Sequence, residues 1–282
     1  MNMTINILIS TIDEGINRVP GVLLDPQPGI TWRISHQYTG DTPPELPAAL
    51  LREDVAVQRQ RGRGVTRSRN HAIEMADADI ALFSDDDVRY TPADMDILRR
   101  TFEANPRVDV AIFKIRTLPG EPEYRDFPAE PVTYTEAPVV GTPQIAFRVD
   151  RVRAAGIRFD ERFGGSDGFL RSSSNERVFV HDCLQAGLNV TYIPEYIVQH
   201  PYHSAIDGIP KYATGRVRMY GAVDARMNGW RALPKAVAGT FSNLPKLRQN
   251  RKNPFSYCRE RLQAALYILR TGNGTTGNVE QV

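Results

Sequence analysis

The sequence has few cysteines and no long apolar run. Among its 282 residues only Cys183 and Cys258 are cysteines, which excludes a disulfide framework and favours a reducing compartment. No apolar stretch approaches the roughly 20 residues that a membrane-spanning helix needs. Residues 1–11 lack the basic flank and apolar core of a secretory signal. We therefore expect a cytoplasmic protein without a membrane span.

Acidic residues are scarce in one part of the chain. Residues 211–270 hold 13 Lys and Arg against only Asp224 and Glu260, so the overall charge of +2 hides a segment of +11 and a remainder of −9. Apolar residues lie among these bases: Phe241, Leu244, Phe255, Leu262, Leu266 and Ile268. A segment of this kind is expected either to lie against an anionic membrane surface, at the inner face of the membrane, or to pack on the rest of the chain or on a second subunit.

Strand and helix signals alternate through about the first two hundred residues. Strands are expected at residues 5–10, 31–35, 55–57, 80–84, 108–115, 145–149, 190–193 and 197–198, with a basic loop at 58–64. Helices are expected at 66–76, from a cap at Thr91 to Asn105, at 150–155, and at 177–186 with Asn175 as the cap.

This alternation predicts an α/β fold, a Rossmann-like and mostly parallel central sheet flanked by helices, followed by a C-terminal helical extension. The predicted organisation is a folded domain over residues 1–208, a basic helical extension over 209–270 and a disordered tail over 271–282.

Three consecutive carboxylates follow the apolar segment 80–83. Asp85, Asp86 and Asp87 repel one another, and a bound cation would remove that repulsion. Oxygen ligands of this kind suit Mg²⁺ or Mn²⁺, and ligands of parallel α/β sheets bind beyond the carboxyl ends of the strands. A solvated acidic turn explains the triplet alone equally well.

Three further groups bear on the chemistry. Arg67 and Arg69 begin the helix before the acidic strand, where they would bind phosphate or form a solvated basic turn. Glu176 begins a later helix after the glycine-rich segment 163–169. It would be either a general base or only a carboxylate that the helix dipole stabilises. Asp167 is the next candidate for the base. His200 follows the apolar residues 196–198, as a metal ligand or as a packing residue, with His203 a weaker candidate.

In their order along the chain these segments resemble a family 2 glycosyltransferase with the A-type nucleotide-sugar-binding fold, over about residues 5–202. Residues 64–73, Gly-Val-Thr-Arg-Ser-Arg-Asn-His-Ala-Ile, are similar to the family's Arg-Asn helix, and residues 78–88 to the strand that ends in its metal-binding Asp-x-Asp motif. Residues 159–164, Phe-Asp-Glu-Arg-Phe-Gly, resemble its acceptor-side segment. Residues 192–195 and 198–200 resemble its closing Tyr-x-Pro and Val-x-His.

The resemblance implies roles for individual residues. Asp85, Asp87 and His200 would hold Mn²⁺ or Mg²⁺, and Glu176 would be the catalytic base. The donor would be bound by Thr11, Gln37, Arg67, Arg69, Asp85 and Asp86. Gln37 stands where the family commonly has an Asp that holds uracil, and its amide would hydrogen-bond to the base. At the usual acidic pair the chain has Asn175-Glu176, so Glu176 is the one carboxylate of the pair.

The function that follows is an inverting, metal-dependent glycosyltransferase of bacterial polysaccharide or glycolipid assembly. It would use a nucleotide-sugar donor, of which a UDP-sugar is favoured, and a saccharide or lipid-linked acceptor, and it would be a monomer or a homo-oligomer. No nucleic-acid module accompanies the tyrosines and arginines near residue 216, so no nucleic acid is expected.

Three other functions were weighed. A haloacid-dehalogenase-type phosphatase lacks its later Lys and acidic pair here. A sugar nucleotidyltransferase should have a glycine-rich loop after the first strand, which residues 10–18 do not form. A non-catalytic carbohydrate- or membrane-binding partner would tolerate loss of the acidic triplet.

Overall fold

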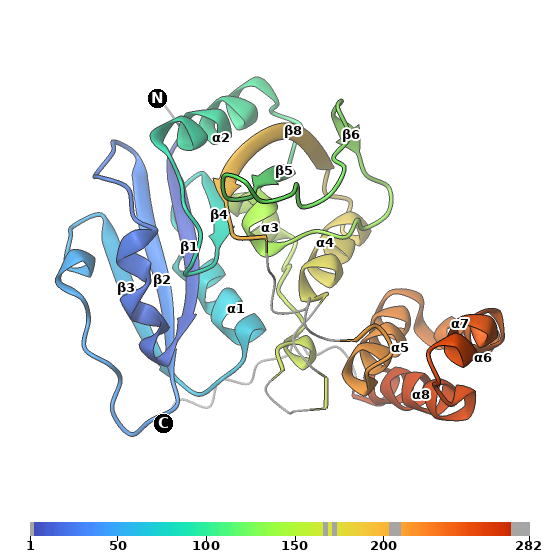
Figure 1. Ribbon diagram of the computed structural model, residues 1–282. Coiled ribbons are helices and arrows are strands. Elements are labelled where there is room, and N and C mark those ends of the chain that lie inside the picture. The colour runs from blue at the N-terminus through green and yellow to red at the C-terminus, as the bar shows by residue number, and fades with distance from the viewer. Residues whose placement is uncertain (1–2, 166–168, 171–173, 203–209, 272–282) are drawn as a thin grey trace.

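The computed structural model describes residues 3–165, 169–170, 174–202 and 210–271 (Figure 1). Its strands are β1 (Ile5–Ile12), β2 (Ile30–Tyr38), β3 (Val55–Arg61), β4 (Ile80–Ser84), β5 (Val110–Arg116), β6 (Val132–Thr133), β7 (Ile145–Arg148) and β8 (Val190–Gln199). Its α-helices are α1 (Val65–Met75), α2 (Pro92–Ala104), α3 (Val149–Ala154), α4 (Asn175–Gln185), α5 (Thr214–Asn228), α6 (Ala232–Ser242), α7 (Leu244–Gln249) and α8 (Pro254–Arg270).

All eight strands belong to one sheet with the order β3-β2-β1-β4-β7-β5-β8-β6. The strands β3, β2, β1 and β4 run parallel, as do β5 and β8. The strands β7 and β6 are antiparallel to their neighbours. The predicted α/β fold with a mostly parallel central sheet and C-terminal helices is confirmed.

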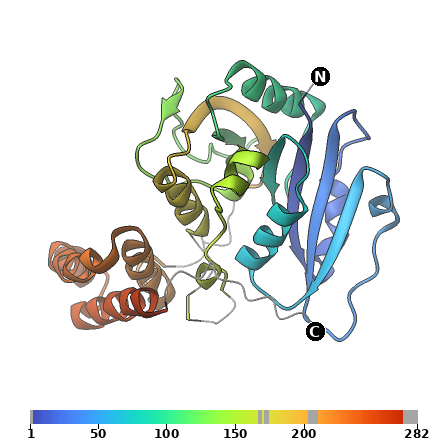
Figure 2. The same ribbon diagram turned by 180° about the vertical axis from the view of Figure 1, so that it is seen from behind.

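Helical segments cover both faces of the sheet. One face packs on α2 and on two short 3-10 helices, Asp13–Asn17 and Val19–Gly21, through Ile7, Leu98 and Phe102. The other packs on α1, α3 and α4 through Phe83, Phe159 and Phe179, and Figure 2 shows these helices in front of the sheet. Because both faces are buried, the central strands read as continuous apolar runs.

Two predictions about strand limits are wrong. The expected loop 58–64 is strand through Arg61, because β3 is an edge strand whose outer side can carry charged side chains such as Arg59. The two expected strands at 190–198 are one strand, β8. The pairing of β8 with β5 passes from Ile112–Tyr192 directly to Lys114–Tyr196, so the extra residues around Pro194 form an irregularity within a continuous strand.

The predicted helix caps are correct in one case and wrong in another. Thr91 and Asp94 form the expected capping box at the start of α2, and the helix ends before Asn105. The residue before α4 is Ser174, with a left-handed backbone, rather than Asn175. The side chain of Asn175 is turned inward, where its oxygen accepts a hydrogen bond from Arg69.

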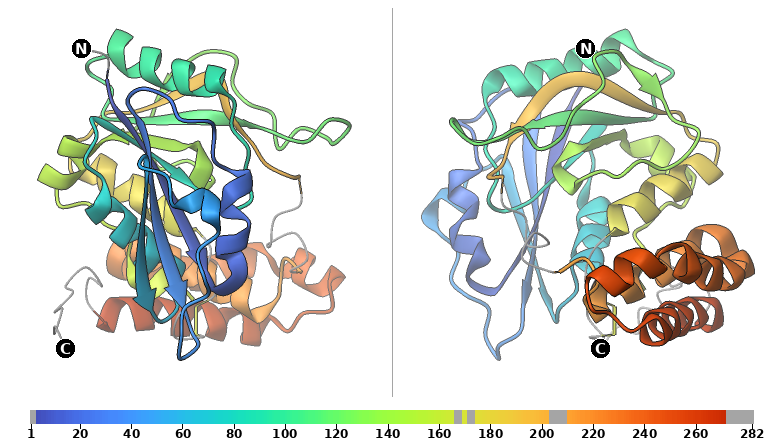
Figure 3. Two further views of the ribbon diagram at one scale, coloured as in Figure 1. Left: turned by 90° about the vertical axis from the view of Figure 1, so that its left-hand side faces the viewer. Right: turned by 45° about the vertical axis from the view of Figure 1, so that its right-hand side comes forward.

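The helices α5–α8 form a separate group beside the sheet domain, referred to below as the C-terminal helices (Figure 3). Helix α5 packs closely on α8 because Gly221 has no side chain; a Cβ there would lie 2.1 Å from the Arg261 carbonyl oxygen. Apolar residues of both helices join Phe163 and Val178 of the sheet domain in one buried cluster. The predicted boundary at residues 208/209 and, except for Thr271, the predicted tail over 271–282 lie outside the described residues.

Ion pairs also join the C-terminal helices to the sheet domain. Arg226 of α5 bonds Asp160 at 3.0 Å and Asp182 at 2.6 Å, and Arg162 donates to the carbonyl of Ile268 at 2.9 Å. No helix in the described part of the chain is both long and apolar enough to cross a membrane.

Candidate active site at the carboxyl edge of the sheet

Parallel pairing brings the predicted donor-binding residues to one edge of the sheet. Thr11 and Gln37 lie at the carboxyl ends of β1 and β2, where Ile12 is paired with Gln37. Strand β4 is the other neighbour of β1, and the acidic triplet follows it directly. The sheet therefore brings residues from three separate segments to one edge, where ligands of parallel α/β sheets bind. Their functional roles stay predictions.

The three aspartates point to three different sets of partners. Asp86 is the most buried: its carboxylate accepts a 2.6 Å hydrogen bond from Thr11 Oγ1 and pairs with Arg18 Nη2 at 2.7 Å. Gly15 leaves room for this pair, because a Cβ there would lie 2.5 Å from Thr11 Oγ1 and 2.6 Å from the Asp86 carboxylate. Asp86 thus fixes the wall of the neighbouring cavity, and Arg18 is a site residue that sequence reasoning missed.

That cavity, of about 380 Å³, opens between the ends of β1 and β2 and the start of α1 and is called the edge cavity here. Its lining includes Thr11, Arg18, Gln37, Arg63 and Asp86. The Nε2 of Gln37 is buried with no hydrogen-bond partner among the described residues, and the same is true of the Ser10 hydroxyl, which also lines the cavity. Buried polar groups are almost always paired, so these two atoms mark places for the polar atoms of a ligand.

The two arginines predicted to bind phosphate have different surroundings. Arg69 is buried, and its Nη1 donates to Asn175 Oδ1 at 2.5 Å and to Glu176 Oε1 at 2.9 Å, while its Nη2 lies 3.4 Å from Asp85. It therefore connects the acidic triplet to Glu176 and is turned away from the edge cavity. Arg67 is exposed and absent from the lining of that cavity, where Arg63 and Arg18 stand instead. Neither Arg67 nor Arg69 lines the edge cavity, and phosphate binding by these two arginines stays a prediction.

Glu176 has one oxygen engaged and one available. Its Oε1 accepts from Arg69 and, at 2.7 Å, from Thr142 Oγ1, and the side chain is 15% exposed. No described residue hydrogen-bonds to Oε2. A carboxylate that is fixed through one oxygen, on a residue that lines a cavity, is a candidate for a general base. Thr142 could not have been found from sequence, because it lies 34 residues away in a segment without a motif.

Asp85 lies between Arg69 and the other acids. A third of the Asp85 side chain is exposed. The surrounding protein still removes much of the solvation of its carboxylate, and this loss raises its pKa. Arg69 counters this effect, while the negative charges of Glu176 and Asp87 add to it. Asp85 therefore lies where an additional positive charge would be strongly favoured.

Asp87 faces His200. Its Oδ1 lies 3.5 Å from His200 Nε2, and this contact holds the pKa of Asp87 below its usual range. Burial lowers the pKa of His200, but the Asp87 carboxylate and the Pro201 carbonyl together outweigh burial and raise it. The Nδ1 of His200 lies 2.6 Å from the Pro201 oxygen, which can only accept, so Nδ1 carries a proton. Tyr124, a further residue that sequence reasoning missed, donates to the same oxygen at 2.8 Å.

This arrangement fits a divalent cation that also binds the donor. Without a cation, Nε2 faces the Asp87 carboxylate as a donor. Because Nδ1 donates to the Pro201 carbonyl, loss of the Nε2 proton would leave a neutral ring with its Nε2 lone pair beside Asp87, which is the usual orientation of a ligating histidine. The described residues contain no group of three or more His, Cys, Asp or Glu side chains that would enclose an ion. Mg²⁺ typically uses one or two carboxylates and completes its shell with phosphate oxygens and water, so Asp87, His200 and the nearby Asp85 are sufficient.

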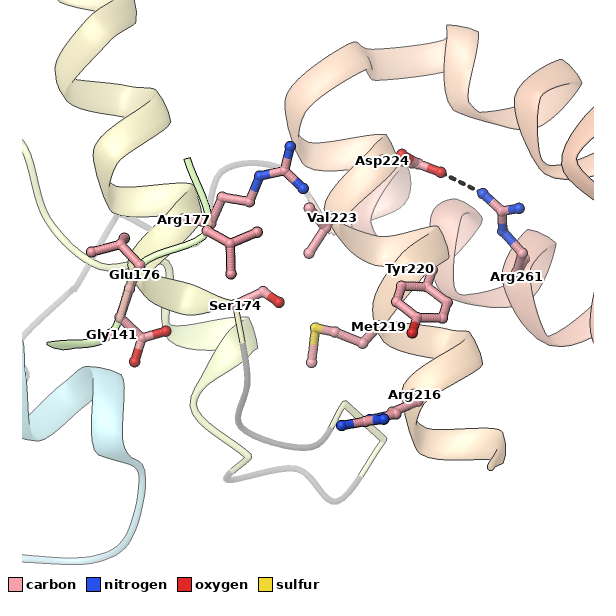
Figure 4. A pocket seen from close by; sticks show the side chains of 12 residues that line it. Gly141, Ser174, Glu176, Arg177, Arg216, Met219, Tyr220, Val223, Asp224 and Arg261 are labelled. Carbon is pink, nitrogen blue, oxygen red and sulfur yellow. Dashed lines mark hydrogen bonds and ion pairs between the residues drawn. The ribbon is translucent and has the colours of Figure 1, made fainter. Parts of the chain in front are cut away.

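A larger cavity, of about 590 Å³, lies on the other side of Glu176 and is called the inter-domain cavity here (Figure 4). Its walls come from the loop 139–141, the start of α4, and the helices α5 and α8. Glu176 thus stands between this cavity and the network that leads through Arg69 to the acidic triplet. The alternative base Asp167, the weaker ligand His203 and residues 166–168 of the glycine-rich segment lie outside the described residues.

Residues 45–164 match the family model described as "Glycosyl transferase family 2". This match covers 120 of the 282 residues, and this part of the chain is similar to that family. The predictions of this family and of a glycosyltransferase are confirmed. The matched segment contains α1 and the acidic triplet, which are the parts of the site on which the resemblance rests.

Solved structures of S. aureus TarS share the fold of this chain. TarS 1–349 matches 99% of the chain over 76% of its own length, with 13% identity and a TM-score of 0.51. TarS 1–349 in complex with UDP-GlcNAc matches 79% of the chain over 66% of its own, with 13% identity and a TM-score of 0.52. The longer TarS chain matches 86% of this chain, with 13% identity and a TM-score of 0.50, and this chain spans only 43% of its length. None of the curated proteins matches the chain in sequence.

Proposed function

We propose that the chain transfers a sugar from a nucleoside-diphosphate sugar to an acceptor hydroxyl, with inversion at the anomeric carbon. The observation that carries the proposal is the position of Glu176. This carboxylate is held through one oxygen, has its other oxygen uncommitted among the described residues, and is connected by Arg69 to the acidic triplet at the sheet edge. A single base beside a donor site is what direct displacement requires.

The edge cavity is the proposed nucleotide site. The unpaired Nε2 of Gln37 would donate to a carbonyl oxygen of the base, and the Ser10 hydroxyl and Arg63 line the same space. Thr11 and Asp86 shape the wall. We propose uridine as the nucleoside, because the amide of Gln37 suits the donor and acceptor edge of uracil and because TarS shares the fold and binds UDP-GlcNAc.

We propose that the donor diphosphate is bound together with Mn²⁺ or Mg²⁺ on Asp87, Asp85 and His200. When bound, such an ion neutralises negative charge that builds on the leaving diphosphate. The protein supplies fixed ligands for it. The hydrogen bond from His200 Nδ1 to the Pro201 carbonyl orients the ring, and Arg69 limits the movement of Asp85.

The acceptor hydroxyl would give its proton to Glu176 Oε2. Its oxygen forms a bond to the anomeric carbon while the bond from that carbon to the diphosphate oxygen breaks, and the electron pair leaves with the nucleoside diphosphate. Thr142 and Arg69 hold Glu176 through Oε1 throughout this step.

A panel of nucleotide sugars tests the proposal. Release of nucleoside diphosphate should occur with a UDP-sugar, should increase in the presence of saccharide acceptors, and should require Mn²⁺ or Mg²⁺. Release of inorganic pyrophosphate from a sugar phosphate and a nucleoside triphosphate would instead identify a nucleotidyltransferase. Binding of saccharide without release of nucleotide from any donor would identify a non-catalytic partner.

We further propose that the C-terminal helices hold the enzyme at an anionic membrane surface, as suits polysaccharide or glycolipid synthesis. Residues 225–259 contain eight Lys and Arg and no Asp or Glu. Large apolar side chains in this stretch are exposed: Trp230 by 64%, Phe241 by 67% and Phe255 by 77%. Of the apolar residues expected to face the membrane, Ile268 is instead buried against the sheet domain.

Exposed aromatic side chains surrounded by bases favour a lipid surface over a protein partner. Val237 and Phe241 are four residues apart in α6 and so lie on one side of it, and Figures 1 and 2 show α6 and α7 at the end of the group that points away from the sheet. Seven bases in 225–259 are exposed. Each base near an anionic leaflet contributes about 1 kcal/mol, and this attraction is screened by salt.

Co-sedimentation with vesicles tests this placement. The protein should bind anionic but not neutral vesicles, less so at high salt, and a Trp230→Ser/Phe241→Ser double variant should lose binding. Leu51→Ser is the matched control, because Leu51 is 72% exposed on the sheet domain. Self-association in solution that is lost in the double variant, without binding to vesicles, would show that a second copy covers this surface.

A further inference from the structure

One wall of the inter-domain cavity is formed by residues to which the family resemblance gives no role. Its lining includes Arg216, Met219, Tyr220, Val223 and Asp224 of α5 and Arg261 of α8. In Figure 4 Met219 and Val223 lie on the side of α5 toward α4, whereas Asp224 and Arg261 point toward each other between α5 and α8. The C-terminal helices therefore complete the space into which the proposed base opens. A cavity of about 590 Å³ has room for one or two sugar units.

The charged side chains that line this cavity are three arginines and two carboxylates, so positive charge is in excess. Its two carboxylates are already paired: Glu176 with Arg69 at 2.9 Å, and Asp224 with Arg261 at 2.5 Å. Arg177 has no carboxylate partner in the described part of the chain. Its Nε donates to the Ala137 carbonyl at 3.2 Å, and its two Nη groups have no hydrogen bond to any described residue.

A second arginine has an unused donor. Arg261 is 8% exposed, and its Nε is buried with no hydrogen-bond partner among the described residues. A buried donor of this kind is costly unless a ligand or water satisfies it. Arg177 and Arg261 come from separate helices and line the same cavity. The Arg261 guanidinium is held by Asp224, whereas the two Nη groups of Arg177 have no described partner and are suited to an anion.

Apart from Ser174 and Arg216, the remaining lining is largely apolar. Val139, Val140, Met219 and Val223 line the cavity together with the ring of Tyr220, and Val139 is 69% exposed at its edge. Such surfaces contact the apolar faces of sugar rings or an alkyl chain. The cavity thus combines a base, an anion-binding side and an apolar side.

We infer that the inter-domain cavity is the acceptor site, and that the acceptor carries an anionic group, a phosphodiester or a carboxylate, close to the hydroxyl that is glycosylated. The inference rests on the proposed function, because it names the acceptor class for the same base. Arg177 binds the anion from the sheet domain. Arg226, which pairs with Asp160 and Asp182, keeps the two walls at a fixed separation.

Three acceptors that differ in charge test the inference: octyl glucoside, which is neutral, octyl glucuronide, which carries a carboxylate, and an octyl glucosyl phosphodiester. The ratio of kcat/KM for each anionic acceptor to that for octyl glucoside should exceed ten. Arg177→Gln should reduce this ratio roughly 10- to 100-fold, as expected for the loss of a charge-assisted hydrogen bond, and Arg177→Lys should retain most of it. Arg107→Gln is the control, because Arg107 is exposed and lines neither the edge cavity nor the inter-domain cavity.

The outcomes separate this inference from the proposed function. An equal or greater preference for octyl glucoside would overturn the inference, and so would an anion preference that Arg177→Gln leaves unchanged. Preference for the glucuronide over the phosphodiester would assign the anion to an acidic sugar, and the reverse to a phosphate linkage. Calorimetric binding of the three compounds without donor measures the same preference, so the inference is tested even if no nucleotide sugar is consumed.

Discussion

Replacement of Glu176 by Gln tests the central element of the site. The substitution keeps the size of the side chain and an oxygen that can accept from both Thr142 and Arg69. It removes basicity at the other oxygen, where the acceptor proton would go. The change therefore separates proton transfer from the placement of the side chain.

The structure gives the magnitude for both activity and stability. Loss of a positioned base lowers turnover by about 10²–10⁴-fold, which is about 3–5 kcal/mol of the activation barrier. Arg69 retains Asn175 and Asp85 as partners, so the folded state loses only the difference between a charged and a neutral hydrogen bond, about 1 kcal/mol. Affinity for the donor should stay within a few-fold of the parent, because Glu176 does not line the edge cavity.

Single-turnover transfer, donor binding and thermal unfolding should be measured on the same preparations. Glu74→Gln is the matched control: Glu74 is an exposed residue of α1 that pairs with Arg158 far from the site. If turnover of Glu176→Gln stays within threefold of the parent, then Glu176 is not the base and only favours the helix dipole. If turnover falls together with donor affinity and with several kcal/mol of stability, then its role is to neutralise Arg69 and not to accept a proton.

Three further predictions concern a proposed metal ligand, the packing of α5 on α8, and a buried carboxylate. Asp87→Ala should abolish transfer and metal-dependent nucleotide binding with little change in melting temperature; full activity would refute its role as ligand. Gly221→Ala should cost about 1–3 kcal/mol of stability, because its Cβ would lie 2.1 Å from the α8 backbone. The control Gly21→Ala has open space around it and should cost nothing measurable. Equal melting temperatures of the two variants would contradict the close packing of α5 on α8. Burial raises the pKa of Asp182 to about 6, so the folded state holds a proton between about pH 4 and 6 that the unfolded chain has lost, and stability falls as pH rises through that window. The Asp182→Asn variant should therefore gain stability relative to the parent over this window, and a difference that does not vary with pH would contradict the raised pKa.

Local sequence determined most elements of the fold and their order. The apolar residues 80–83 form β4, the capping box of Thr91 and Asp94 begins α2, and the alternation of strands and helices indicates the parallel sheet. These features depend on neighbouring residues and on the requirement to bury apolar side chains, both of which are readable in one dimension. The same reasoning placed Thr11, Gln37 and the acidic triplet at one edge, because parallel strands end on the same side.

Only the tertiary structure decided what these side chains contact. Asp86 pairs with Arg18 across 68 residues, and Glu176 is held by Thr142 across 34, so no local pattern could have indicated either partner. Arg69 was expected to bind phosphate, yet packing turns it inward as the link between Asp85 and Glu176. The inter-domain cavity exists only because α5 and α8 dock on the sheet domain. Contacts between side chains from distant segments form only when the whole chain packs. The sequence therefore determines the chemistry of this site only through the complete fold.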